Sequence, residues 1–285
     1  MSGAALGLVL LAAGAHALWN LVAKTAPGGG TAFVWLASIL GACVLAPPAL
    51  VLIATSPPSL AAVWFMVGSG VLHAVYFACL QRGYRDGDLS LVYPLARGTG
   101  PLLATVAAVL VLGERPGGLA LVGGAVVVAA ILWLAAPAVR AGAPGTSWAL
   151  ATGVTIAAYT LWDKHAVDGL DASPIVYFWA TEVGIVLVLA PFVAHAAGGT
   201  RAAFLSSWRV DRRSALAVAL LSGFAYILVL YALQLAPVSY VAPARESSVL
   251  IGAALGVGVL GEGDRRRRLG CAAAIVVGIA ALALG

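Results

Sequence analysis

The sequence predicts an all-α integral membrane protein with ten transmembrane helices, arranged as two inverted repeats of five helices each. The first reason is composition: 62% of the 285 residues are hydrophobic and 9% are charged, whereas about 25% of the residues of an ordinary soluble domain are charged. The second reason is that ten apolar runs reach the roughly 17 to 25 residues that a helix needs to cross a bilayer. The third is that motifs of the first half return in the second half.

The ten predicted spans are separated by residues that end helices. Three consecutive glycines follow the first span, which we expect to be a retained helix rather than a signal peptide. Pro57 and Pro58 separate the second span from the third. Ser173 before Pro174 is typical of the cap and first turn of a helix. The predicted spans are Gly3–Ala23, Thr31–Ala54, Leu60–Gln81, Leu89–Leu112, Gly117–Ala136, Ser147–His165, Pro174–Ala196, Ser214–Leu235, Ser239–Leu260 and Leu269–Gly285.

The two halves of the chain are predicted to be related repeats. In each half an arginine stands 17 residues before the glutamate of a Leu-Gly-Glu motif, as Arg97 with Glu114 and as Arg245 with Glu262. A tryptophan-containing segment that begins at Trp35 recurs 144 residues later. Shared spacing in several motifs indicates one ancestral five-helix unit that occurs twice.

The basic residues predict the orientation of the spans. Twelve of the 16 lysines and arginines lie in odd-numbered connectors, whereas the even-numbered connectors hold only Arg115 and Lys164. By the positive-inside rule the odd connectors are cytoplasmic, which places both termini on the outer side of the cell inner (plasma) membrane. Because each repeat has an odd number of spans, residues 141–285 are predicted to insert upside down relative to residues 1–140.

The net charge of +5 is therefore explained by membrane orientation and not by a nucleic-acid partner. The longest connector, residues 197–213, is too short to fold as a soluble domain, and its four arginines suit an anionic lipid surface. The lipid bilayer is thus an expected partner. Whether the protein forms a homodimer is left open.

The repeated motifs resemble a known transporter family. A proline and an arginine open the fourth span of each half and Leu-Gly-Glu closes it, while the first spans carry His16-Ala-Leu-Trp-Asn20 and Tyr159-Thr-Leu-Trp-Asp163. In these features the whole chain resembles the EamA branch of the drug/metabolite transporter superfamily. The resemblance implies paired EamA domains but no particular substrate, because that superfamily handles amino acids, nucleotide sugars, sugar phosphates and drugs. Neither first span has the membrane-embedded glutamate of small multidrug relatives, which disfavours multidrug antiport.

Two arginines inside apolar spans are the first candidates for substrate binding. An arginine in mid-helix costs roughly 2.5 to 3.5 kcal/mol on insertion scales, so it needs a partner or water. Arg97 lies about 12 Å inside its span, among two prolines and two glycines that should loosen the helix. Arg245 lies similarly deep and enters from the opposite side. We expect both guanidiniums to hold an anionic group, with Glu246 neutralising Arg245 until substrate displaces it; the alternative is that each arginine extends to its nearer interface.

Histidine and tyrosine form a second set near mid-depth. His16 aligns with Tyr159 in the repeats, and His73 aligns with Tyr226. The four side chains together predict a polar cavity at the midplane. The alternative for each one alone is a hydrogen bond between helices, which contributes only about 0.6 kcal/mol on average.

Four glutamates are candidates for coupling or gating, with Glu182 and Glu246 as the candidates for proton coupling. Glu182 lies close to the bilayer centre, where it is either protonated, because desolvation disfavours the charge, or paired with a basic group such as His16, His73 or an arginine. We interpret Glu182 as a proton carrier with a nearby histidine as relay; the alternative is a protonated glutamate that hydrogen-bonds a neighbouring helix. Glu114 and Glu262 end helices at the interface and suit either gating or loop anchoring.

The predicted function is secondary transport, with export favoured, of a small polar metabolite, and the two arginines favour one that carries an anionic group. Transport would proceed by alternating access around a midplane cavity, without ATP because no phosphate-binding loop occurs. One alternative is an intramembrane enzyme, but paired acids in one helix, a His-x-x-x-His set and a Gly-x-Ser-x-Gly motif are all missing. Another is a non-transporting scaffold, which would leave the mid-depth polar groups without a role.

The three cysteines lie in apolar runs, so neither a disulfide framework nor a metal is expected, and no cofactor is predicted.

Overall fold

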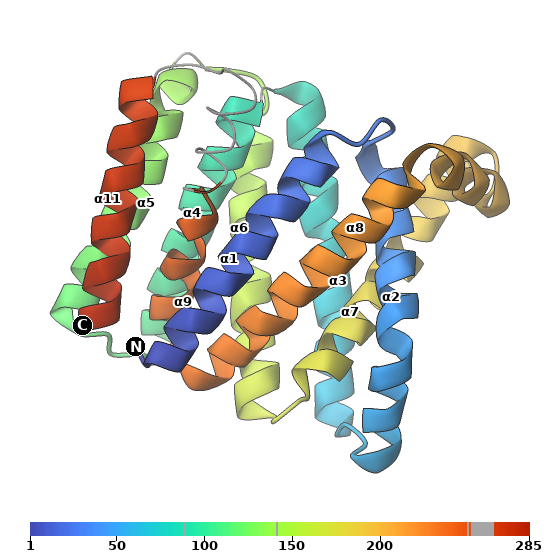
Figure 1. Ribbon diagram of the computed structural model, residues 1–285, viewed down its shortest axis with the longest axis horizontal. Helices are drawn as coiled ribbons and strands as arrows, with labels where there is room; N and C mark the ends of the chain where they lie inside the picture. Colours follow the sequence, from blue (N-terminus) through green and yellow to red (C-terminus); the bar gives the residue numbers. More distant parts are fainter. Residues whose placement is uncertain (88, 141, 250, 252–264) are drawn as a thin grey trace.

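The computed structural model describes the whole chain except residues 88, 141, 250 and 252–264, and the described residues form ten α-helices and no strand (Figure 1). A short π-helical turn, η1, follows α6. The all-α prediction is therefore confirmed for this part of the chain. The elements are α1 (Gly3–Lys24), α2 (Gly30–Thr55), α3 (Leu60–Asp86), α4 (Leu89–Val111), α5 (Gly118–Arg140), α6 (Thr146–Lys164), η1 (His165–Gly169), α7 (Pro174–Ala197), α8 (Thr200–Leu235), α9 (Val238–Arg245) and α11 (Arg265–Leu284).

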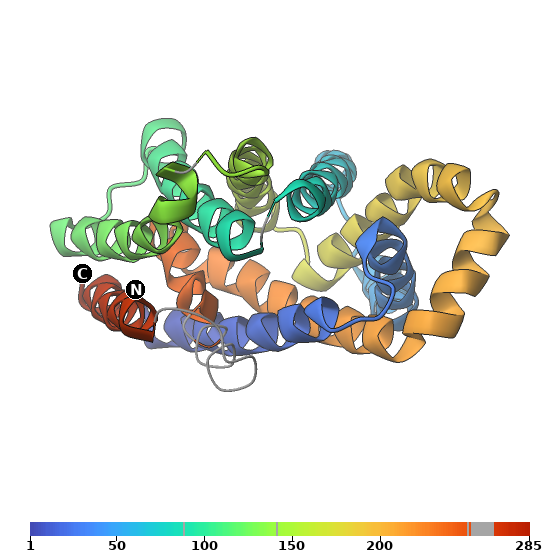
Figure 2. The ribbon, with the colours of Figure 1, turned by 90° about the horizontal axis from the view of Figure 1, so that it is seen from above.

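The helix bounds agree with most predicted spans and differ in two places. α8 begins at Thr200 instead of Ser214, because the arginine-rich connector continues the helix and gives it 36 residues. Its first turns lie at the outer edge of the bundle when the molecule is seen from above (Figure 2). The ninth span is interrupted: α9 ends at Arg245 and Glu246 stands in a turn. Most of the remaining predicted span, up to Leu260, falls outside the described residues.

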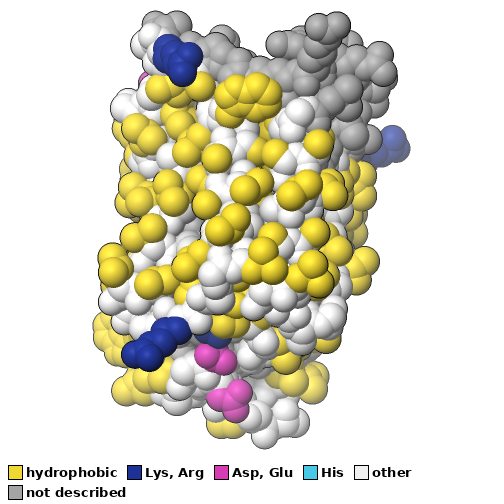
Figure 3. All heavy atoms as spheres, turned by 90° about the vertical axis from the view of Figure 1, so that its left-hand side faces the viewer, with side chains coloured by type: hydrophobic (Ala, Val, Ile, Leu, Met, Phe, Trp, Pro, Cys, Tyr) yellow, Lys and Arg dark blue, Asp and Glu magenta, His cyan; other side chains and the backbone are white. Residues whose placement is uncertain are grey.

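The outer surface has the character expected of a multi-pass membrane protein. By length and composition, five of the described helices are long and apolar enough to cross a membrane, namely α1, α2, α3, α7 and α8. Shorter apolar stretches lie in α4, α5 and α11. On the face formed by α5 and α11, hydrophobic side chains cover most of the height, and the charged ones gather near the two ends (Figure 3). Lipid tails would cover such a band, and the helical backbone satisfies its own hydrogen bonds there.

The helices of the two halves pack against one another in matching pairs. α1 packs along α8, and α6 packs along α3 in the corresponding way. α2 packs against α8 as α7 packs against α3, while three contacts join equivalent helices: α2 with α7, α4 with α9 and α5 with α11. This is the pattern expected of two related five-helix units. The two termini lie at the same end of the bundle (Figure 1).

Glycines let two of these helix pairs approach closely. A Cβ atom added at Gly70 of α3 would lie 2.8 Å from the Cα atom of Gly184 in α7. A Cβ atom at Gly123 of α5 would lie 2.6 Å from the carbonyl oxygen of Gly278 in α11. Helix association in membranes depends on such close packing, because lipid removes most of the hydrophobic driving force. Small residues therefore hold the two halves together at these points.

Candidate functional site

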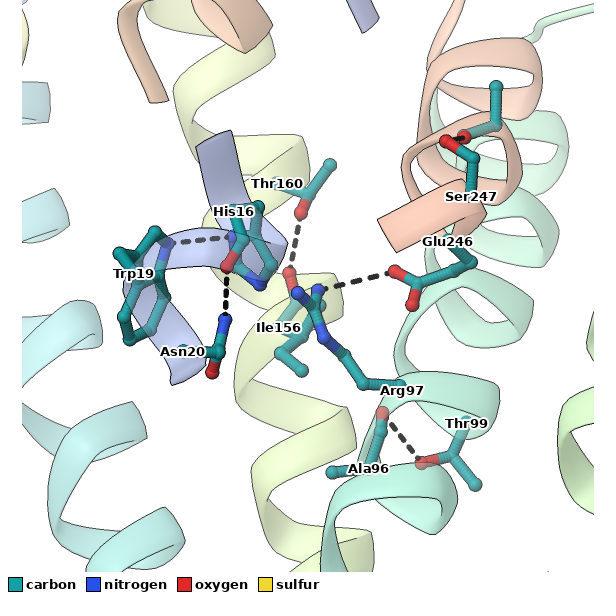
Figure 4. Close-up of polar contacts among 11 residues, drawn as sticks. His16, Trp19, Asn20, Ala96, Arg97, Thr99, Ile156, Thr160, Glu246 and Ser247 are labelled. Atoms are coloured by element: carbon teal, nitrogen blue, oxygen red, sulfur yellow. Dashed lines mark hydrogen bonds and ion pairs between the residues drawn. The ribbon is translucent and has the colours of Figure 1, made fainter. Parts of the chain in front are cut away.

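The first predicted arginine, Arg97, lies in the interior and pairs with a residue of the other half. Its side chain projects from α4, and its Nη1 donates a hydrogen bond to Oε1 of Glu246 at 3.2 Å (Figure 4). Both side chains are buried. The direct ion pair of Glu246 is thus with Arg97, while the charge of Arg245 acts on the same carboxyl group through space. Arg97 does not extend to the nearer interface.

The second arginine, Arg245, is also buried but has a different environment. Only 8% of its surface is exposed. Its guanidinium carbon lies 5.5 Å from the ring centroid of Tyr226 on α8, an arrangement that allows a cation–π interaction. Within the part of the chain that the structure describes, Arg245 forms no hydrogen bond and no ion pair.

The two helices that carry these arginines are not equally interrupted. α4 continues through Arg97 to Val111, so the predicted loosening of this helix is not observed. The hydroxyl of Thr99 donates to the carbonyl oxygen of Leu95 at 2.7 Å within the same stretch. α9, by contrast, stops at Arg245. The discontinuity predicted for both repeats is present in the second.

Three of the four predicted histidine and tyrosine residues form one aromatic group. His73 of α3 stacks on Tyr159 of α6 with 4.2 Å between ring centroids. Its ring also lies 5.2 Å from that of Tyr226, edge to face. Nδ1 of His73 is 3.2 Å from the hydroxyl oxygen of Ser69. Helices from both halves therefore contribute to the group, as the repeat alignment of His73 with Tyr226 predicts.

The fourth member, His16 of α1, lies beside the arginines instead. It is close enough to Arg97 and Arg245 to experience their charge. Its Nδ1 accepts a hydrogen bond from Nε1 of Trp19 at 3.1 Å, and its carbonyl oxygen accepts one from the amide of Asn20 at 2.7 Å (Figure 4). The ring is therefore oriented by its own helix.

Asp163 is a member of the site that was not among the binding residues predicted from the sequence. It is completely buried at the end of α6. Its two carboxylate oxygens accept hydrogen bonds from the hydroxyls of Tyr177, at 2.7 Å, and of Tyr226, at 2.5 Å. A usable signal was present in the sequence, since Asp163 occupies the last position of the repeated motif in which the first half has Asn20.

These observations define one central polar cluster that is built from both halves of the chain. All members except the partly buried Tyr226 are buried, and the members come from α3, α4, α6, α8, α9 and the turn after α9. The central polar cluster comprises His73, Arg97, Tyr159, Asp163, Tyr226, Arg245 and Glu246.

Glu182 lies in a different environment, between α2 and α7. Its carboxyl group contacts Ser38, the residue in the equivalent position of the first repeat, and packs against Gly41. Oε2 has no hydrogen-bond partner among the described residues, and no ion pair with an arginine or histidine is present there. The histidine relay expected beside Glu182 is not observed, because His73 faces Ser69 and Tyr159 instead.

Glu114 contacts the beginning of α9. Its two carboxylate oxygens accept hydrogen bonds from the backbone N–H groups of Val238, at 2.7 Å, and Ser239, at 2.9 Å. The first N–H groups of a helix have no partner inside the helix, and a negative charge is favourable there. This contact anchors the connector after α4 to α9. Glu262, the equivalent residue of the second half, lies outside the described residues.

The described residues contain no group of three or more His, Cys, Asp or Glu side chains that could hold a metal ion. Cys43 and Cys79 lie on separate helices, α2 and α3, and Cys271 is buried on α11. The chemistry available in the central polar cluster is therefore hydrogen bonding, ion pairing and aromatic stacking.

Comparisons with known proteins bear on the predicted resemblance. No curated protein matches the chain by sequence. Among 28 matching chains of solved structures, one crystal structure of a protein with 17% sequence identity covers 100% of this chain and 98% of its own, with a TM-score of 0.75. At that identity the likeness shows the fold alone. The model of the EamA-like transporter family matches twice, over residues 3–136 and 143–284. The chain therefore belongs to the EamA-like transporter family, within the drug/metabolite transporter superfamily.

Proposed function

We propose that this membrane transporter moves a small polar metabolite through the central polar cluster as a secondary transporter. The observation that carries the proposal is the ion pair between Arg97 and Glu246, which joins the two halves inside the protein. Charged side chains inside a membrane protein are costly, and they commonly mark the pathway of a substrate or ion. A scaffold would gain nothing from such a pair, since apolar residues of similar size would pack as well.

Alternating access is the mechanism that fits a central polar cluster whose charged groups are buried. The charged members of the central polar cluster are buried, so a substrate reaches these groups only when helices move apart. In transporters built from inverted repeats, one half rocks against the other and opens the site to each side in turn. The matched packing of α1 on α8 and of α6 on α3 supports two such halves, residues 1–140 and 141–285. The proposal includes both termini on the outer side of the inner membrane.

Arg245, a buried guanidinium without a carboxylate ion pair among the described residues, favours a substrate with an anionic group. A guanidinium offers several N–H donors in one plane and binds carboxylate or phosphate oxygens in pairs. Neither Arg97 nor Arg245 reaches the outer surface in this structure. We propose export as the direction of transport.

Glu182 is the candidate for coupling transport to protons. Its carboxyl group is buried with one oxygen unpartnered and no cation against it among the described residues. A neutral carboxyl group fits such a position better than a charged one. A group that is neutral here and charged in another conformation would carry a proton through the cycle.

The test begins with a thermal-shift screen of the purified protein against small metabolites, because a ligand at 100 times its dissociation constant stabilises by about 2.7 kcal/mol. Each stabilising compound is then measured for counterflow exchange in proteoliposomes, which needs no ion gradient. We expect exchange by the wild type and a loss of about tenfold in Tyr159→Ala, whose ring contacts contribute roughly 0.5 to 1.5 kcal/mol. Trp64→Ala, at an exposed position of α3, is the control and should exchange normally. Compounds that bind but never cross would contradict transport.

A further inference from the structure

The two repeat-related arginines have unequal charge partners. Arg97 is neutralised by Glu246, with 3.2 Å between Nη1 and Oε1. The residue that follows Arg97 in the first half is Gly98, so that half supplies no equivalent carboxylate for Arg245. Among the described residues Arg245 has no hydrogen bond and no ion pair. Glu246 thus pairs directly with Arg97 and interacts with Arg245 only through space, so the N–H donors of Arg245 have no acceptor among the described residues.

Tyr226 holds Arg245 in a way that leaves its donors available. The guanidinium carbon lies over the tyrosine ring at 5.5 Å from the centroid. A cation–π contact provides no lone pair for the N–H groups of the guanidinium, and no hydrogen-bond acceptor for them is present among the described residues. Tyr226 is itself fixed, because its hydroxyl donates to Asp163 and its ring packs against His73 at 5.2 Å and Phe178 at 5.4 Å. Arg245 is thus positioned by a rigid aromatic support.

A buried guanidinium without an ion pair is stabilised when an anion binds it. Arg245 has 8% of its surface exposed, so water reaches few of its donors. Arginine keeps its charge in proteins, because its guanidinium cannot be deprotonated there. An unpaired charge at such a site is costly unless a counter-ion arrives. The side chain therefore favours any state in which an anionic group binds its free edge.

The surroundings of Arg245 favour a single negative charge. The carboxylate of Asp163 is joined to the same Tyr226 that supports the guanidinium. A second negative charge on the bound group would be repelled by Asp163, whereas the charge of Glu246 is balanced by Arg97. A carboxylate brings one charge and two oxygens in the geometry that guanidinium edges bind.

We infer that Arg245 alone, and not Arg97, binds the charged group of the substrate, and that this group is a single carboxylate. The inference rests on the proposed function and assigns its substrate class. Arg97 and Glu246 form an internal neutral pair that the carboxylate does not replace. The expected substrate is thus a small organic monocarboxylate.

The experiment measures binding to the purified full-length protein by thermal shift at constant ionic strength. The probes are small monocarboxylates, each compared with its own amide: lactate with lactamide, benzoate with benzamide and nicotinate with nicotinamide. Inorganic phosphate at pH 8 provides a doubly charged probe. The variants are Arg245→Gln, Arg245→Lys and the double variant Arg97→Gln with Glu246→Gln. The double variant removes both charges of the Arg97–Glu246 ion pair at once.

We expect at least one carboxylate to bind the wild type at least tenfold more tightly than its amide, and phosphate to bind no better than the amides. Arg245→Gln should abolish that preference, whereas the double variant should keep it. Arg245→Lys keeps the positive charge but loses the paired N–H donors, so it should retain a weaker preference for the carboxylate. This variant also tests the inference if Arg245→Gln does not fold.

Four results would overturn the inference: a full preference in Arg245→Gln, unchanged binding in Arg245→Lys, loss of the preference in the double variant, or phosphate binding as tight as that of the best carboxylate. A wild type that binds no carboxylate better than its amide also overturns it. In that last case uncharged metabolites that bind and exchange would leave the proposed transport function intact, so the two failures can be told apart.

Discussion

The two copies of the arginine motif fold differently, and they also differ in the residue that follows the arginine. After Arg97 the first half has Gly98, and α4 continues while Gly98 packs against α5, where an added Cβ atom would lie 2.9 Å from Cδ2 of Leu132. After Arg245 the second half has Glu246, α9 ends, and the carboxylate reaches across to Arg97. Glu246, which has no counterpart in the first half, thus supplies the counter-ion for Arg97 of that half. Repeats with similar sequences can therefore supply unequal halves of one site.

Breaking this pair should have the largest effect on stability. Glu246→Gln leaves Arg97 buried without a counter-ion, and we expect the free energy of unfolding to fall by about 3 to 5 kcal/mol. Removing both partners, in Arg97→Gln with Glu246→Gln, should restore a large part of that loss. Unfolding in a detergent series for the wild type, both single variants and the double variant measures the coupling. If the single losses add to within about 0.5 kcal/mol, the two residues act independently and the pair does not stabilise the halves.

The next effect concerns the aromatic support of Arg245. Tyr226→Phe removes the hydroxyl that donates to the buried carboxylate of Asp163, and we expect a loss of about 1.5 to 3 kcal/mol in unfolding free energy. The ring itself remains, so its contact with Arg245 should persist. Tyr231→Phe, a partly exposed tyrosine on the same helix, is the matched control and should change stability little. Equal losses in the two variants would argue against the hydrogen bond to Asp163 as the cause.

A pair of repeat-related glycines compares the two halves at another helix contact. Gly70 and Gly223 follow equivalent serines in the two repeats, yet an added Cβ atom would meet backbone of Gly184 at 2.8 Å in the first case and a Phe178 ring atom at 3.4 Å in the second. We expect Gly70→Ala to cost about 1 to 3 kcal/mol, because the backbone of α7 cannot yield easily. Gly223→Ala should stay within about 0.5 kcal/mol. Thermal unfolding of the two variants measures this asymmetry, and equal decreases in their unfolding midpoints would contradict it.

Several of these features could be predicted from the sequence, because they depend on local patterns. Apolar length predicted the helices, and motif spacing predicted that the two arginines, His73 and Tyr226 belong to related positions. The partner of Glu246 could not be predicted in this way, since it depends on how α9 ends and how it packs on α4. Asp163 was not predicted as a site residue for a similar reason, since its place in the site depends on tyrosines of α7 and α8 that pack around it. The helical start of α8 was missed because polar, arginine-rich residues do not resemble a membrane span.

Glu182 and Ser38 provide the last comparison, since they hold equivalent positions in the two repeats and contact each other between α7 and α2. If the carboxyl group is neutral in this conformation, Glu182→Gln preserves its size and its contact with Ser38. We then expect the unfolding free energy to change by no more than about 0.5 kcal/mol. Counterflow exchange should also persist, because it needs no gradient, whereas accumulation driven by a pH gradient should be lost when no proton can be carried. Ser38→Ala, which removes the partner but leaves the carboxyl group, should retain gradient-driven accumulation. Proteoliposomes with and without a pH gradient provide the measurement, and a glutamine variant that still concentrates substrate would leave Glu182 with a packing role only.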